Sequence, residues 1–281
     1  RKENIAFHLI SAGCAFFVLA LIVILWFRFN IVPSCIMFFA AIAFTWGIAF
    51  AIRLIKSHEE KILLENALSR YFPRSLATRI LAEKRTELKP SEKRLTVLFA
   101  DISGFTKWSS DKTPETVHAF LSDYLESMAT VIFDKGGTVD KFIGDGILAF
   151  FGDPFEQQDH AARAARTAIA MQRKADELRD KWQPVVDIDL RIRIGINTGP
   201  VIVGNLGTKT RIEYTVIGAT VNLASRMESN APVGGILVTE STRNGAGDGF
   251  IWGEEREVSA KGYDQPVTAY VLDAMADKNN L

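Results

Sequence analysis

The hydrophobic positions are distributed unevenly, with two long apolar runs near the N-terminus and alternating apolar and polar segments after residue 90. The runs over residues 5–27 and 31–52 contain no Asp, Glu, Lys or Arg. Each run is longer than the roughly 20 residues with which a helix crosses about 30 Å of hydrocarbon. The pattern predicts a transmembrane helical hairpin over residues 1–52, and the alternative is a pair of buried core helices.

Positive charges flank this predicted hairpin on its outer sides. They precede the first run and follow the second, and a single one lies between the runs: Arg1, Lys2, Arg53, Lys56 and Lys61 outside, Arg28 inside. Positive residues concentrate on the cytoplasmic side of membrane proteins. The distribution predicts a multi-pass protein of the cell inner membrane, in contact with the lipid bilayer, whose following domain lies in the cytoplasm.

The segment over residues 53–90 is polar and has a partly helical pattern. Leu64, Leu68 and Tyr71 fall on one face of a helix, and Pro73 interrupts that helix. We expect a helical linker that transmits a signal to the domain that follows. Because the heptad pattern is short, a passive solvated connector is the alternative.

Residues 91–281 alternate strand-like apolar runs with amphipathic helical segments. Strands are expected over 94–102, 138–152 (a hairpin), 187–199 and 200–207, and helices over 114–137 and 159–182. Pro114 suits the first turn of a helix, and Gly144 and Gly146 suit the tip of the hairpin. The order β-α-β-β-α-β predicts an α+β fold, in which helices cover an antiparallel sheet as in ferredoxin-like proteins.

Composition excludes several classes of protein. The 33 basic and 33 acidic residues balance, so the chain lacks the positive charge of a nucleic-acid-binding protein. The two cysteines, Cys14 and Cys35, lie in the apolar runs, which excludes a disulfide framework in the remainder. The four histidines are scattered, and no Cys/His spacing indicates zinc. We therefore expect no nucleic acid among the partners.

Two acidic residues lie where predicted strands end. Asp101 is near the end of the strand over 94–102, and Asp145 is at the tip of the hairpin. In a ferredoxin-like sheet the first strand ends beside this tip, so the two carboxylates converge at one edge. Converging carboxylates repel each other unless a countercharge such as a divalent cation is present. We expect a metal site; the alternatives are a helix cap by Asp101 or Ser103 and an ordinary Asp-Gly turn.

Four segments resemble the signature segments of one known family, the class III nucleotidyl cyclases: FADISGFT, DKFIGDGILAFFG, IRIGINTGPVIVGNLG and YTVIGATVNLASRME. They have the order and spacing that are typical of this family, and the resemblance covers about residues 94–272. It implies a membrane-anchored adenylate cyclase that converts ATP into 3′,5′-cyclic AMP and pyrophosphate, with two Mg²⁺ or Mn²⁺ ions in each active site.

The resemblance also implies roles for individual residues. Asp101 and Asp145, with the backbone carbonyl of Ile102, resemble the metal ligands, and Lys141 and Thr215 match the two positions that read the purine base. Many relatives that read adenine carry Asp where this chain has Thr215. Because Thr can donate as well as accept, we expect weaker base discrimination than with Asp. Some members of the subgroup with Thr respond to bicarbonate, so bicarbonate is a candidate regulator.

Three further residues match positions that contact the substrate in this family. Asn222 resembles the residue that orients the ribose, Arg226 the one that stabilises charge on the α-phosphate, and Lys261 the lysine that holds the terminal phosphates. Asn222 and Arg226 share one helix face in this pattern; a polar helix surface is the alternative. In the family the metal ligands come from one subunit, and the base readers, Asn and Arg come from the other. One chain with both sets implies a homodimer with two shared sites.

Two other functions compete with adenylate cyclase. A guanylate cyclase calls for an acid such as Glu where Lys141 stands, because guanine presents N1–H as a donor, whereas Lys fits the N1 acceptor of adenine. A catalytically inactive, cyclase-like dimeric signalling module would have lost a metal ligand or Arg226, yet Asp101, Asp145 and Arg226 are all present. The sequence therefore favours an active enzyme that uses ATP.

Overall fold

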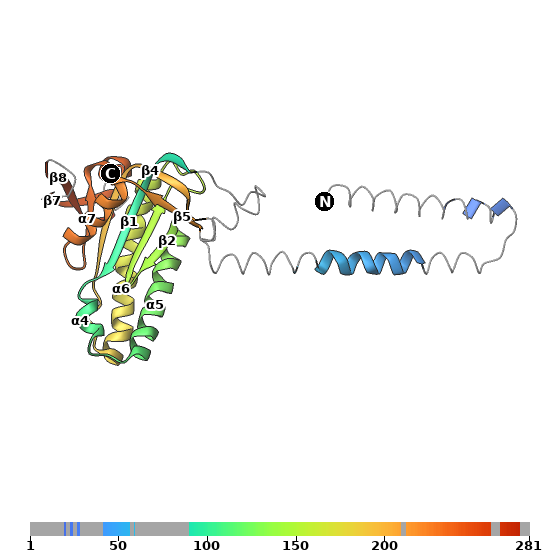
Figure 1. Cartoon of the computed structure of the whole chain (residues 1–281), viewed down its shortest axis with the longest axis horizontal. Coiled ribbons are helices and arrows are strands. Elements are labelled where there is room, and N and C mark those ends of the chain that lie inside the picture. Colours follow the sequence, from blue (N-terminus) through green and yellow to red (C-terminus); the bar gives the residue numbers. More distant parts are fainter. Residues whose placement is uncertain are drawn as a thin grey trace. The chain divides into compact units, whose positions relative to one another are not determined.

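The structure, a computed structural model, describes residues 20, 23–24, 27–28, 42–56, 59, 90–208, 212–259 and 265–275. The chain divides into two compact units, Arg1–Leu68 and Ser69–Leu281. The strands and helices labelled in Figure 1 all belong to the second unit.

The described part of the first unit contradicts the predicted location. Its longest described helical stretch covers residues 42–56. Among the residues that the structure describes, no helix is long and apolar enough to cross a membrane. The prediction of a multi-pass inner-membrane protein with a cytoplasmic catalytic domain is therefore wrong, and the described residues contain no transmembrane hairpin.

Several predictions concern residues outside the described ranges. Most of the residues of the two apolar runs lie there, as does most of the predicted linker over 53–90. Lys261, the residue expected to hold the terminal phosphates, also lies there. The signal-transmitting linker and the role of Lys261 therefore stay predictions.

The second unit is built on one mixed sheet. Its strands are β1 (Ser91–Ile102), β2 (Thr138–Ile143), β3 (Gly146–Phe151), β4 (Ile192–Gly207), β5 (Ile212–Ile217), β6 (Ile236–Thr239), β7 (Phe250–Val258) and β8 (Val267–Met275). The order is β2-β3-β1-β4-β6-β8-β7, and β5 pairs with β4. β1 is antiparallel to β3 and β4, whereas β6 is parallel to β4.

Five helices accompany the described strands: α4 (Phe105–Ser109), α5 (Pro114–Asp134), α6 (His160–Val186), α7 (Ala219–Asn230) and α8 (Glu240–Ala246). The succession β1-α5-β2-β3-α6-β4, with β1 between β3 and β4, is the expected ferredoxin-like arrangement. Pro114 begins α5, and the side chain of Thr113 caps it by accepting a hydrogen bond from the backbone of Thr116. The predicted α+β class is confirmed.

β4 differs from the sequence-based prediction. Strands were expected over 187–199 and 200–207, but the structure contains one continuous strand that starts at Ile192. It is continuous because β1 pairs with it from Ile192 to Val203, across the predicted break between residues 199 and 200. Pro200, which lacks a backbone N–H, is exposed within this strand, and its carbonyl accepts a 2.6 Å hydrogen bond from Thr220.

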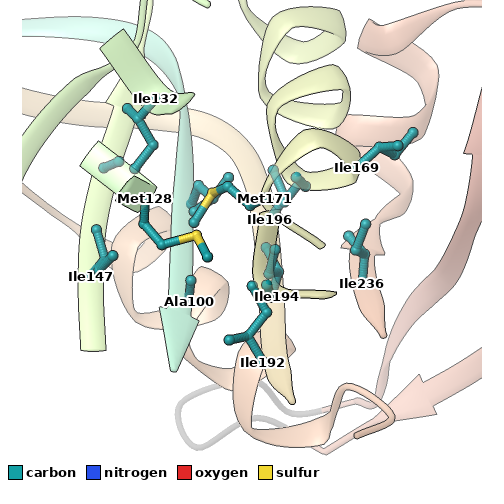
Figure 2. Packing of buried hydrophobic residues seen from close by; sticks show 14 of the residues in the cluster. Ala100, Met128, Ile132, Ile147, Ile169, Met171, Ile192, Ile194, Ile196 and Ile236 are labelled. Carbon is teal, nitrogen blue, oxygen red and sulfur yellow. The ribbon is translucent and has the colours of Figure 1, made fainter. Parts of the chain in front are cut away.

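Apolar side chains cover both faces of the sheet. On one face, Met128 of α5 and Met171 of α6 belong to one cluster with the isoleucines of β4 (Figure 2). On the other face α7 packs directly against β4 at Gly195, where a Cβ atom would lie 1.9 Å from the backbone nitrogen of Glu228. Glycine at this position therefore determines how closely α7 approaches the strand that pairs with β1.

Candidate active site

The carboxylate pair, Asp101 and Asp145, lies where β1 ends beside the turn between β2 and β3. The register pairs Ala100 of β1 with Ile147 of β3, which places both acids at the same edge. The backbone N–H of Ile102 donates a hydrogen bond of 3.2 Å to Oδ2 of Asp145. The convergence that the topology predicts is confirmed.

The electrostatics of the carboxylate pair fit a divalent cation. Burial, followed by the negative charge of Asp101, raises the pKa of Asp145 from 3.8 to about 6. Carboxylate and carbonyl oxygens are the ligands that Mg²⁺ and Mn²⁺ prefer. The described part of the chain has no group of three or more His, Cys, Asp or Glu residues that could hold a metal ion. Further ligands would therefore come from backbone oxygens, water or phosphate groups.

Arg193 of β4 stands opposite Asp101 in the β1–β4 register. Its Nη2 lies 3.8 Å from Oδ2 of Asp101, and its Nε lies 3.3 Å from Oε1 of Glu228 in α7. Burial raises the pKa of Glu228, although the charge of Arg193 lowers it. Sequence analysis missed Arg193, because its partner in β1 depends on a strand register that the pattern of residues 187–199 does not reveal.

Tyr124 of α5 is a second residue that sequence analysis missed. It is fully buried, and its hydroxyl has no hydrogen-bond partner among the described residues. Burial raises the pKa of its phenol, and the charges of Asp101 and Asp145 raise it further. On the side of α5, the carboxylate pair therefore lies near a neutral, buried phenol and not near a positive charge.

A second group of polar side chains, the β2–β5 cluster, contains Asp140 and Lys141 from β2 with Glu213 and Thr215 from β5. Nζ of Lys141 lies 2.8 Å from Oε2 of Glu213 and 3.5 Å from Oδ1 of Asp140. Burial alone lowers the pKa of Lys141, but the hydrogen bond to Glu213 and the charge of Asp140 outweigh it and raise the pKa. Lys141 is therefore an ammonium group, which can only donate.

Asp140 joins the two residues that were predicted to read a base. Oδ2 of Asp140 accepts a 2.6 Å hydrogen bond from the hydroxyl of Thr215 and a 3.2 Å hydrogen bond from the backbone N–H of Val216. The structure thus brings Lys141 and Thr215 together through one carboxylate. Sequence analysis passed over Asp140, although the segment VDKF places it directly before Lys141.

Asn222 and Arg226 lie on the exposed side of α7, four residues apart as the helical pattern predicts. The opposite side of α7 carries the buried Leu223, Ala224 and Met227. Both side chains are therefore available to a ligand or to a second chain. The alternative interpretation, a polar helix surface without a role in binding, predicts the same geometry. A functional test has to separate the two interpretations.

Comparisons with known proteins agree with this geometry. The family described as "Adenylate and Guanylate cyclase catalytic domain" matches residues 88–274. The adenylate cyclase of Anabaena cylindrica is 36% identical over 193 residues, which are 66% of this chain and 38% of that protein. The chain spans less than half the length of such curated relatives.

Solved structures of both substrate types are similar to this chain. The guanylyl cyclase Cya2 has a TM-score of 0.66 at 39% identity, over 69% of this chain and 98% of that chain. The adenylyl cyclase CyaB from P. aeruginosa has a TM-score of 0.65 at 38% identity, over 69% of this chain and 100% of that chain. The likeness therefore establishes the catalytic domain and leaves the choice of purine to the residues themselves.

Proposed function

Because this chain belongs to the class III adenylate and guanylate cyclase family, we propose that it is an adenylate cyclase. The observation that carries the proposal is the carboxylate pair, in which burial, followed by the charge of Asp101, raises the pKa of Asp145 to about 6. Two acids in this arrangement bind a divalent cation more readily than they ionise together without one. Phosphoryl transfer from a nucleoside triphosphate needs such cations.

The proposed reaction forms one phosphorus–oxygen bond and breaks another. The 3′-oxygen of ATP loses its proton and attacks the α-phosphorus, the bond from this phosphorus to the bridging oxygen breaks, and pyrophosphate leaves. Asp101, Asp145 and the carbonyl of Ile102 would hold two Mg²⁺ or Mn²⁺ ions. When bound, these ions neutralise the triphosphate and lower the pKa of the 3′-hydroxyl.

The remaining site residues bind and orient the substrate in this proposal. The guanidinium of Arg226 stabilises the charge that develops on the α-phosphate, because its planar fork of donors matches phosphate oxygens. Asn222 orients the ribose, and Lys261 holds the terminal phosphates. Lys141 donates to N1 of adenine, and Thr215 contacts the amino group of the same base.

We also propose a homodimer with two shared active sites. The exposed position of Asn222 and Arg226 on α7 supports this proposal, since both side chains are free to reach a site on a second copy. Each site would combine the carboxylate pair of one chain with α7 and the β2–β5 cluster of the other. Bicarbonate as a regulator rests on the subgroup resemblance alone, and adding it at constant pH tests it.

The choice of ATP over GTP rests on Lys141. An ammonium group in this position can donate to N1 of adenine but cannot accept from the N1–H of guanine. The deciding experiment incubates the protein with ATP or GTP in the presence of Mg²⁺ or Mn²⁺ and identifies the product. We expect cyclic AMP and pyrophosphate. Preferential formation of cyclic GMP from GTP would assign the second candidate, guanylate cyclase, and no product from either nucleotide would indicate an inactive module.

A further inference from the structure

Asp140 is a carboxylate with almost no access to solvent, and it lies between the two proposed base readers. Its side chain is 1% exposed, and its Oδ2 accepts hydrogen bonds from the hydroxyl of Thr215 and from the backbone N–H of Val216. A group this deeply buried does not reach a substrate itself. Any effect that it has on a bound purine must pass through its neighbours.

The hydrogen bond between Asp140 and Thr215 has a defined direction. A backbone N–H can only donate, so Oδ2 of Asp140, which Val216 contacts at 3.2 Å, has to act as an acceptor. The contact from Thr215 to the same oxygen is 2.6 Å, in the range of a hydroxyl that donates to a carboxylate. The single hydroxyl hydrogen of Thr215 therefore points toward Asp140, and only its lone pairs remain for other partners.

The ion pair with Lys141 supports this direction. Burial keeps the pKa of Asp140 above its ordinary value, and the Thr215 hydroxyl, the charge of Lys141 and the Val216 N–H offset only part of this rise. The ammonium of Lys141 lies 3.5 Å from Oδ1 and favours the ionised carboxylate. Thr215 is itself only 6% exposed, which leaves its hydroxyl few alternative orientations.

We propose that Asp140 is a positioning residue that makes Thr215 a pure hydrogen-bond acceptor and thereby selects adenine over guanine. The proposal rests on the adenylate cyclase function and deepens it. Adenine carries an amino group at C6, which donates, whereas guanine carries a carbonyl oxygen there, which accepts. A hydroxyl that is free to rotate serves both bases. A hydroxyl whose hydrogen is held by Asp140 serves the adenine amino group and opposes the guanine oxygen.

Two substitutions at this position separate the proposal from a merely structural role. Asp140→Leu removes the acceptor and frees the Thr215 hydroxyl, so the ratio of kcat/KM for ATP to that for GTP should fall about tenfold, as for one hydrogen bond. Asp140→Asn retains an oxygen that can accept from both Thr215 and Val216, so the ratio should stay within about threefold of wild type. Because both nucleotides are measured on one protein sample, a loss of folded protein cancels in the ratio.

A third variant tests whether the effect passes through Thr215. Thr215→Val removes the hydroxyl but keeps the shape of the side chain, so it should lower the ATP/GTP ratio by itself. Asp140→Leu should then change the ratio no further when it is added to Thr215→Val. Full additivity of the two substitutions would overturn the proposal, since Asp140 would then act by another route.

Binding measurements distinguish this inference from the function on which it rests. Affinities for 3′-deoxy-ATP and 3′-deoxy-GTP, which cannot cyclise, report base selection without turnover. If the wild type forms cyclic AMP but Asp140→Leu keeps the full ATP/GTP ratio, the inference fails and the function stands. If the wild type forms no product yet binds the adenine analogue in an Asp140-dependent way, the function fails and the inference stands. Binding of neither analogue overturns both.

The Asn variant keeps the test decisive if Asp140→Leu does not fold. An ATP/GTP ratio that falls tenfold or more in Asp140→Asn would show that the negative charge, and not the acceptor, is what matters. That result would overturn the proposed direction of the Thr215 hydrogen bond. A ratio that stays close to wild type, together with a collapsed ratio in Thr215→Val, would support it.

Discussion

The carboxylate pair and the β2–β5 cluster both contain acids that are at least partly buried, but the two regions balance the negative charge of these acids differently. In the cluster, Asp140 accepts two hydrogen bonds from its own chain and has the ammonium of Lys141 at 3.5 Å. In the pair, Asp101 and Asp145 face each other, and the guanidinium of Arg193 comes no closer than 3.8 Å to Asp101. The first region provides its buried acid with two hydrogen-bond donors and a nearby ammonium, whereas the second has only the more distant guanidinium of Arg193.

This difference indicates which of the two regions requires a bound cation to balance its charge. An acid with donors in its own chain contributes to folding, and its removal leaves those donors without a partner. Two acids that repel each other lower the stability of the fold until a cation binds between them. Substitution of Asp101 or Asp145 should therefore lower activity without lowering stability. Substitution of Asp140 should lower stability.

The largest expected effect is at the carboxylate pair. Asp101→Ala or Asp145→Ala should lower the rate of cyclic AMP formation by about a thousandfold or more, because the loss of a metal ligand removes hydroxyl activation and charge neutralisation together. Thermal unfolding without metal should occur at the wild-type temperature or above it. Asp159→Ala, which removes an exposed acid paired with Arg163 and Arg166, is the control and should stay active. Activity of Asp101→Ala within about tenfold of wild type would reject the metal assignment.

Mixing two inactive variants should restore activity if the sites are shared. Chains with Asp101→Ala and chains with Arg226→Ala form mixed dimers, each with one intact site and one doubly damaged site. Equal amounts should recover about a quarter of the wild-type rate, since about half of the dimers are mixed. Each variant alone provides the baseline. If mixed dimers are detected by differential tagging but the rate stays at baseline, shared sites are excluded.

An intermediate effect is expected where Lys141 meets the base. Lys141→Glu should lower the ATP/GTP ratio of kcat/KM about a hundredfold, since it removes a donor to adenine N1 and adds an acceptor for guanine N1–H. The conversion should be incomplete, because Thr215 is retained. Lys181→Glu, the same change of charge at a lysine that pairs with Asp123, is the control and should leave the ratio unchanged. An unaltered ratio in Lys141→Glu would remove Lys141 from the base site.

The smallest expected effect concerns pH and stability in the absence of metal. Asp145 has a pKa of about 6 in the folded protein and 3.8 as a reference, so the folded state binds this proton more tightly. Stability should therefore fall as pH rises from about 4 through about 6, by about 1.5 kcal/mol once solvent screening of this half-buried group is included. Denaturant unfolding at a series of pH values measures the fall.

The difference between wild type and Asp145→Asn isolates this contribution from other titrating acids. The Asn variant has no proton to lose at this position, so its stability should exceed that of the wild type increasingly between about pH 4 and pH 7. Millimolar Mn²⁺ at neutral pH should raise the unfolding temperature of the wild type and leave Asp145→Asn nearly unchanged. Parallel pH curves for the two proteins would argue against repulsion between Asp101 and Asp145.

Local sequence patterns were sufficient for the order of the elements and for half of the site. Apolar runs, Pro114 and the glycines around Asp145 mark strand ends, a helix start and a hairpin tip, and the structure contains all three. From the order β-α-β-β-α-β alone, Asp101 and Asp145 have to meet at one edge of the sheet. The membrane location predicted from the apolar runs was wrong. Among the described residues, no helix is long and apolar enough to cross a membrane.

The tertiary structure decided the contacts that give these residues their electrostatic character. Asp140 and Thr215 are 75 residues apart, and their hydrogen bond exists because β5 pairs with β4 and comes to lie near β2. Arg193 faces Asp101 because the β1–β4 register places them opposite each other. A residue pattern reports which face of a strand is apolar, but it does not report which residue of a distant strand lies alongside. Register is set by packing of the whole sheet, so the partners of Asp140 and Asp101 follow from the assembled fold.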